Sequence, residues 1–160
     1  MTIERYSVGF VRPQPIASGE AYAELLAGAS DPVSVKLITV TTASAVGGHV
    51  SLAHSYAIGT GAATGIHTGV AHRLVATSAT GPARAQVAWT SSGASPTGYR
   101  SRMKDEILPI ATGQTSVLWD AQSDGDLTIE PGRSIVLINQ GSGIDAGGLR
   151  INFTWEEGRR

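Results

Sequence analysis

The stretch Leu149-Arg-Ile-Asn-Phe-Thr-Trp-Glu156 alternates strictly between apolar and polar residues. Its apolar members are Leu149, Ile151, Phe153 and Trp155. In an extended strand a period of two places these four side chains on one face and the polar ones on the other. The stretch therefore predicts an antiparallel strand with one face in the core and the other in solvent.

Other segments repeat this alternation, and glycine-rich turn signals separate them. Alternating segments are found at 6–10, 50–58, 70–74 and 87–89, and 115–119 and 127–129 add two short runs. Residues 33–40 and 134–138 have apolar side chains on both faces, which predicts central strands covered on both sides. We therefore expect an all-β fold, an antiparallel two-sheet sandwich of about nine or ten strands. A jelly-roll-like topology is expected first and an immunoglobulin-like one second.

For two segments near the N-terminus, the sequence does not decide the structure. Residues 18–28 fit either a helix capped by Ser18 or an edge strand. Residues 1–15 are a candidate extended arm, because Pro13 and Pro15 interrupt the first strand early. No linker or repeat divides the chain, so residues 1–160 are expected to form a single domain.

Composition narrows the class of protein. The 160 residues include 16% charged residues, against roughly 25% in an average soluble domain, and the net charge is −1. A near-neutral chain argues against a nucleic-acid-binding surface. The absence of cysteine excludes disulfides and thiolate metal sites. No apolar run approaches the length of a membrane span, and the first residues lack the apolar core of a secretory signal. We expect synthesis in the cytoplasm of a host and no membrane partner.

The charges are unevenly distributed along the chain. Residues 32–104 contain six basic residues and no acid, whereas residues 105–160 contain nine acids and four bases. Within the middle block, residues 37–72 carry no Asp, Glu, Lys or Arg at all. This neutral segment is longer than one buried strand needs, so part of it is expected to face another protein.

Four histidines are the first candidates for metal chemistry. They are His49, His54, His67 and His72. Each pair is five residues apart, an odd spacing that puts its two members on opposite faces of a strand. His54 and His72 share the phase of apolar neighbours and are able to meet across strands, but no carboxylate lies between residues 32 and 104 to orient them. Buried or interfacial histidines are therefore expected, and no metal or other cofactor.

The remaining motifs are each better explained as structure. Residues 59–65 look loosely like a dinucleotide loop, but no acidic residue follows at the distance the fingerprint needs. Asp120, Asp124, Asp126 and Glu130 supply oxygen ligands without calcium-loop spacing, around a strong turn signal. Arg100, Arg102 and Lys104 suggest a solvated loop or a basic arm that binds an acidic neighbour, in preference to a nucleic-acid contact. The Gly-Ser-Gly at Ser142 reads as a turn, so no catalytic residue is expected.

Two segments carry a resemblance to a known family. Residues 127–139, followed by a glycine-rich hairpin and residues 149–157, resemble the ending of tailed-bacteriophage virion proteins with a jelly-roll fold. Residues 21–28, leading into 33–40, are similar to the same group. The resemblance implies a small, non-enzymatic structural subunit, often trimeric, on a capsid or tail.

The resulting expectation is a capsid decoration or cement subunit on the virion surface. Its partners would be copies of itself, expected as a homotrimer, and the major capsid protein or another virion protein. A minor tail or receptor-binding protein is the alternative within that class. From another class, a cupin-like metal-dependent enzyme using His54 and His72 remains the rival.

Overall fold

The computed structural model describes residues 2–12, 21–42, 48–55, 63–71, 80–89, 99–108, 113–140 and 149–159. These residues form strands and turns, with no helix among them. The strands are β1 (Thr2–Arg12), β2 (Ala21–Leu26), β3 (Val33–Thr42), β4 (Gly48–Ser55), β5 (Ala63–Ala71), β6 (Thr80–Trp89), β7 (Tyr99–Leu108), β8 (Thr115–Asp120), β9 (Leu127–Ile129), β10 (Ser134–Asn139) and β11 (Leu149–Arg159).

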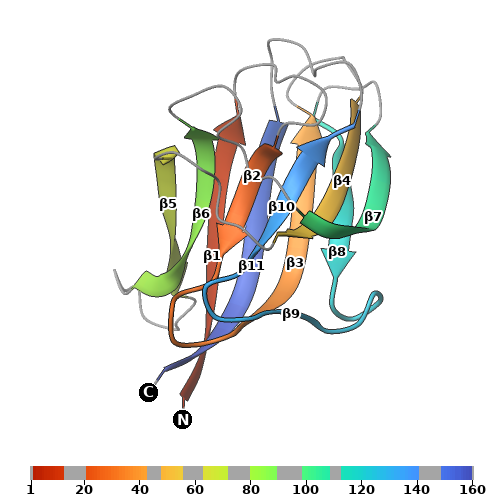
Figure 1. Cartoon of the computed structure of the whole chain (residues 1–160). Helices are drawn as coiled ribbons and strands as arrows, with labels where there is room; N and C mark the ends of the chain where they lie inside the picture. The colour runs from red at the N-terminus through yellow and green to blue at the C-terminus, as the bar shows by residue number, and fades with distance from the viewer. Residues whose placement is uncertain are drawn as a thin grey trace.

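The strands form two layers that pack face to face (Figure 1). One layer has the order β1-β11-β3-β8 and is called the β11 sheet; the other has the order β2-β10-β4-β7 and is called the β10 sheet. Every pairing is antiparallel. The expected all-β, antiparallel two-sheet sandwich is therefore confirmed.

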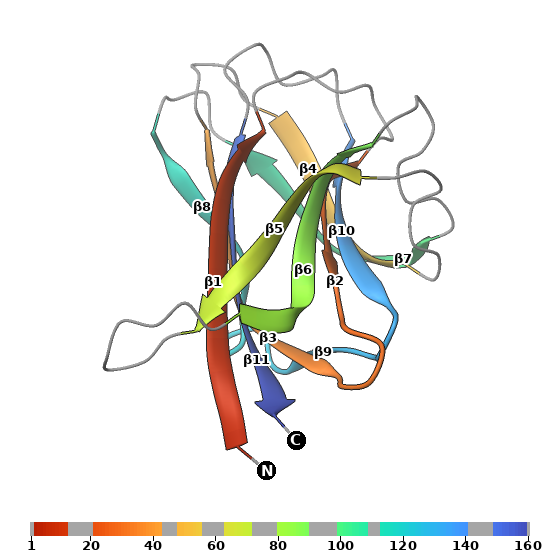
Figure 2. The same ribbon diagram turned by 90° about the vertical axis from the view of Figure 1, so that its left-hand side faces the viewer.

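The hairpin of β5 and β6 joins the two sheets along one edge. β5 pairs with β1 of the β11 sheet, and β6 pairs with β2 of the β10 sheet. Figure 2 shows the hairpin spanning this edge. Hydrogen bonding consequently runs unbroken from β7 to β8, and β9 extends the β11 sheet beside the start of β3.

Strand β11 has the burial pattern that its sequence predicts. Residues from Leu149 to Glu157 at odd positions are buried, and those at even positions are exposed or half-buried. Trp155 is fully buried and stacks on Tyr6 of β1, with ring centroids 6.0 Å apart. Its indole N–H donates to Glu157 Oε1 at 2.7 Å. The apolar side chains of both sheets form one core between the layers.

The two segments predicted as doubly covered strands differ. β10 is buried at all six positions, as expected. β3 instead alternates between buried and half-buried residues, because it lies in the β11 sheet, whose outer face is accessible. A register shift between Thr154 and Trp155 places both Lys36 and Leu37 outside the core. That irregularity gave the sequence its appearance of two apolar faces.

The N-terminal segments are strands. Within residues 18–28, Ala21–Leu26 form β2, which lies between β10 and β6, so the helix is wrong and the strand is not at the edge. Residues 18–20 lie outside the described residues. Residues 2–12, expected as part of an arm, pair along their whole length with β11. Residues 13–15 are not among those described.

A tight turn connects β9 to β10. The N–H of Arg133 donates to the carbonyl of Glu130 at 3.0 Å, and Gly132 has a φ of 69°. Proline at the second position and a left-handed glycine at the third are typical of a type II turn. The Pro-Gly pair thus sets the direction in which β10 enters its sheet.

Candidate functional site: the outer face of the β11 sheet

The outer face of the β11 sheet is the candidate functional site. The odd positions of β1 and the even positions of β11 point away from the core, because Tyr6 and Trp155, which alternate with them, are buried. Among the described residues, three large apolar side chains are exposed: Ile3 (67%), Val11 (46%) and Val117 (48%). The first two lie on β1 and the third on β8, so all three share this face.

The centre of the face is polar and uncharged. Gly9 of β1 is paired with Asn152 of β11, which is paired with Thr39 of β3. Asn152 donates through Nδ2 to Thr39 Oγ1 at 3.2 Å. Beside them the hydroxyls of Thr41 and Thr115 are 2.7 Å apart, in hydrogen-bond contact. Short neutral side chains that bond to one another give a flat surface with little charge to desolvate.

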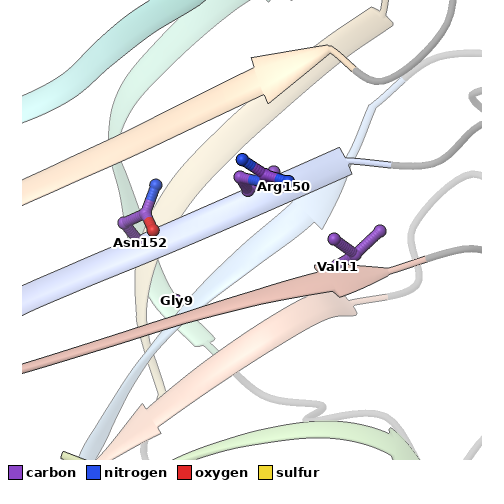
Figure 3. A pocket seen from close by; sticks show the side chains of 4 residues that line it. All are labelled: Gly9, Val11, Arg150 and Asn152. Carbon is purple, nitrogen blue, oxygen red and sulfur yellow. The ribbon is translucent and has the colours of Figure 1, made fainter. Parts of the chain in front are cut away.

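A shallow hollow of about 310 Å³ lies on this face, lined by Gly9, Val11, Arg150 and Asn152 (Figure 3). It exists because Gly9 has no side chain. A Cβ at that position would clash with the amide oxygen of Asn152. The glycine therefore leaves room for the asparagine to reach across from β11.

Arg150 is the charged group of this hollow. It is exposed at the start of β11, between Val11 and Thr41 on the neighbouring strands. Its guanidinium makes no hydrogen bond or ion pair with any residue in the described part of the chain. A guanidinium has five donors in a planar fork that matches a carboxylate. The hollow is consequently suited to a carboxylate presented by a second molecule.

At the opposite end of β11 the charges are already paired. Arg5 donates through Nη2 and Nε to Glu156 Oε1 at 2.7 and 3.1 Å, and Lys36 Nζ lies 3.2 Å from Oε2. The Arg5 hydrogen bond, followed by Lys36, holds the pKa of Glu156 below its usual value, although partial burial acts in the opposite direction. Arg5 and Lys36 therefore each have an ion-pair partner, whereas Arg150 has none among the described residues.

The predicted acidic cluster is a turn and an ion pair. Asp120 and Asp124 cap the turn after β8, where Asp124 accepts from the backbone N–H of Asp120 at 2.9 Å. Lys104 Nζ reaches Asp124 Oδ2 at 3.0 Å from β7, across the open edge of the sandwich. The Asp120 N–H, then Lys104, lower the pKa of Asp124. Asp126 and Glu130 are exposed on either side of β9.

The basic cluster is thus a strand rather than a loop. Lys104 binds an acid of its own chain. Arg100 and Arg102 also belong to β7. Their side chains are not among those that the structure describes.

The structure describes the side chains of two of the four histidines. His49 and His54 lie on β4, half-buried and in opposite phase, as their spacing predicts. His67 belongs to β5, but its side chain is not described, and His72 lies outside the described residues. Within the described ranges, no three His, Asp or Glu side chains gather as metal ligands do. The proposed meeting of His54 and His72 stays a prediction.

The remaining candidates can be placed briefly. Ser142 and residues 59–62 lie outside the described residues, while residues 63–65 begin β5. Of the neutral segment 37–72, Ile38, Val40 and Leu52 are in the core, whereas Thr39 and Thr41 lie on the outer face of the β11 sheet. In the described part of this segment, much of the neutrality therefore reflects burial.

Sequence reasoning did not group Gly9, Arg150 and Asn152. The available signal was a glycine at an outward position of an otherwise alternating strand. The position of this glycine pointed to Asn152 and Arg150 only once the register of β1 against β11 was known.

In the described part of the structure, no helix is long and apolar enough to cross a membrane. Comparison with protein-family models, with curated proteins and with solved structures returned no match.

Proposed function

We propose that the protein is a structural subunit of a tailed-bacteriophage virion, a capsid decoration or cement protein that acts by protein–protein contact. The observation that carries the proposal is the outer face of the β11 sheet, on which Ile3, Val11 and Val117 are exposed around a neutral, polar centre. The resemblance of residues 127–139 and 149–157 to such virion proteins supplies the class.

The order of the strands supports a jelly roll. β1 to β4 alternate between the two sheets, and the later strands pair with them in the reverse order: β11 beside β1 and β3, β10 beside β2 and β4. Such nesting is expected when a long antiparallel hairpin folds over into two sheets, as in jelly rolls of viral capsid domains. The β5–β6 hairpin is then an insertion between the fourth and fifth strands of that roll.

The proposed mechanism is burial of surface. Apolar area removed from water contributes about 25 cal/mol per Å², offset by the loss of translational and rotational freedom on association. Threonine and asparagine side chains that already bond to one another on the face lose few water contacts when it is covered. The flat β11 sheet therefore suits repeated contacts on a particle better than a deep ligand cleft.

Immunogold labelling tests the location. Antibody against the purified protein is applied to virions assembled from the genome that encodes the chain. Labelled heads are expected. Labelled tails would favour the tail or receptor-binding alternative, and unlabelled virions would overturn the proposal. Elemental analysis of the purified protein tests the metalloenzyme rival, which requires a stoichiometric metal.

Binding to heads that lack the protein tests the face itself. Val117→Glu places a charge among the exposed apolar residues, so we expect at least tenfold weaker co-sedimentation at micromolar concentrations. Ser30→Glu adds the same charge in the exposed connection between β2 and β3, and it should bind as the wild type does. Equal binding by both variants would show that this face is not the contact.

A further inference from the structure

The outer face of the β11 sheet carries unpaired charges of opposite sign at its two ends. Arg150 is exposed at one end, without an ion pair to any described residue. Asp126 and Glu130 flank β9 at the other end, exposed and likewise without a side-chain partner among the described residues. In contrast, Asp124 and Glu156 are already held by Lys104 and by Arg5.

Strand β3 fixes the separation of these two ends. Thr41, near its end, is paired with Arg150, and Val33, at its start, is paired with Ile129 of β9. Eight residues at about 3.3 Å each place them roughly 26 Å apart. Arg150 therefore does not reach Asp126 or Glu130 of its own chain.

We infer that this face binds a second copy of the chain, and that Arg150 of one copy pairs with Asp126 or Glu130 of the other. The contact rests on the proposed function, which requires the face to be an assembly surface. It assigns that surface to contact between neighbouring copies on the particle, so that binding to heads depends on Val117 through this copy-to-copy contact. Val11, Val117 and the neutral centre are buried between the copies, and the two charged ends fix their relative orientation.

The size and symmetry of the face agree with this pairing. Ten-residue strands and four strands spaced about 4.8 Å apart give a footprint of roughly 33 by 19 Å, or about 600 Å². Stable interfaces begin at about 600 Å² per partner, so the face is large enough for a contact at the lower end of that range. A two-fold axis midway between Arg150 and β9 brings each arginine onto the other copy's acidic residues, so that one interface contains the contact twice.

Complementary charge explains why a second copy is a suitable partner. Electrostatic matching mainly governs orientation and association rate, and pairs at an interface rim weaken with salt. Placing both halves of the pair on one chain allows a single gene product to assemble with itself.

Charge reversal tests the pairing directly by sedimentation velocity on the full chain at low salt. We expect the wild type to self-associate in the micromolar range. Arg150→Glu and, separately, the double change Asp126→Lys and Glu130→Lys should each raise the dissociation constant at least tenfold. Combining all three changes on one chain restores opposite charges across the contact and should restore association.

The matched control is Ser30→Glu, which adds a negative charge at an exposed position outside the strands of the face and should not weaken association. A monomeric wild type at 100 µM or more overturns the inference, as do unaffected reversals or a combined variant that stays dissociated. Circular dichroism checks that each variant, altered only at exposed positions, is folded. A monomer that still labels virions overturns this contact and not the proposed function; an oligomer absent from virions does the reverse.

Discussion

The two sheets of the sandwich differ most on the faces that point away from the shared core. On the β11 sheet the outer residues are exposed or half-buried, and Val117 is 48% exposed. On the β10 sheet, β2 and β10 are buried at every position. Val136, which belongs to a small apolar cluster separate from the main core, is 0% exposed.

This difference divides the molecule into a covered face that contributes to stability and an accessible face to which we assign the proposed contacts. Both faces consist of antiparallel strands, but the covered one holds Ala53, Val136 and Ile138, whereas the accessible one holds threonines and Asn152. Covered positions resist polar substitution because a buried polar group loses its water. Accessible positions tolerate it, so the outer face of the β11 sheet is free to be adapted to a partner.

The sharpest test compares two valines. Val136→Asp puts an unpaired charge into the covered face and should lower the free energy of unfolding by at least about 3 kcal/mol. Val117→Asp on the accessible face should change it by no more than about 1 kcal/mol. Urea unfolding measures both, and Val136→Ala serves if the aspartate variant does not fold. Equal losses for the two aspartate variants would contradict the distinction between the faces.

A second pair compares hydrogen bonds. Ser134 donates to the fully buried carboxylate of Glu24, whereas Thr41 and Thr115 bond to each other on the accessible face. Ser134→Ala removes a hydrogen-bond donor to a buried carboxyl group and should cost about 2 kcal/mol of unfolding free energy. Thr115→Val should stay within about 0.5 kcal/mol. A larger loss for Thr115→Val, in the same urea titration, would reverse the assignment.

Gly9 tests whether the accessible face has any tight packing. Gly9→Ala forces the Asn152 amide to move and weakens its bond to Thr39, at a cost of about 1 kcal/mol. In an Asn152→Ala background the obstruction is gone, so the same change should cost nothing or stabilise the strand. A double-mutant cycle with urea unfolding measures this coupling. Additive effects would show that the glycine is not needed for the asparagine.

The smallest effect concerns the Arg5–Glu156–Lys36 group. Because the pKa of Glu156 is lowered in the folded protein, its contribution to stability is present above the ordinary value of 4.5 and is lost as the pH falls through the lowered pKa. Arg5→Gln should raise this pKa more than Lys36→Gln, since the Arg5 hydrogen bond is the larger cause. Carboxyl NMR titration of Glu156 measures the order, and the opposite ranking would contradict it.

Much of the fold follows from local patterns. The alternation in residues 149–156 predicted burial position by position, and the continuous apolar run of residues 134–138 predicted a strand covered on both faces. Residues 33–40 were misread because a register shift moved two consecutive residues to the outer face. Residues 21–26 have only the spacing of small and apolar side chains, which helix and strand share, so the neighbouring strands decided their structure.

The candidate site was less predictable. Arg150, Gly9 and Val117 are distant in sequence and individually unremarkable, and no spacing rule connects them. They lie on one face only because β1 pairs with β11, and β11 with β3, in a particular register. The uncharged segment 37–72 pointed to β3 correctly for Thr39 and Thr41, but most of its described apolar residues are in the core.

The sequence by itself determined the strand class, the inward and outward positions of β11 and the lack of cysteine chemistry, because side-chain period and residue type are properties of the local chain. The tertiary structure alone decided which outer face is covered, that Arg150 has no ion-pair partner among the described residues, and which glycine makes room for an asparagine. Those properties depend on what a neighbouring strand or sheet places opposite each residue, and strand register sets this over separations of more than a hundred residues.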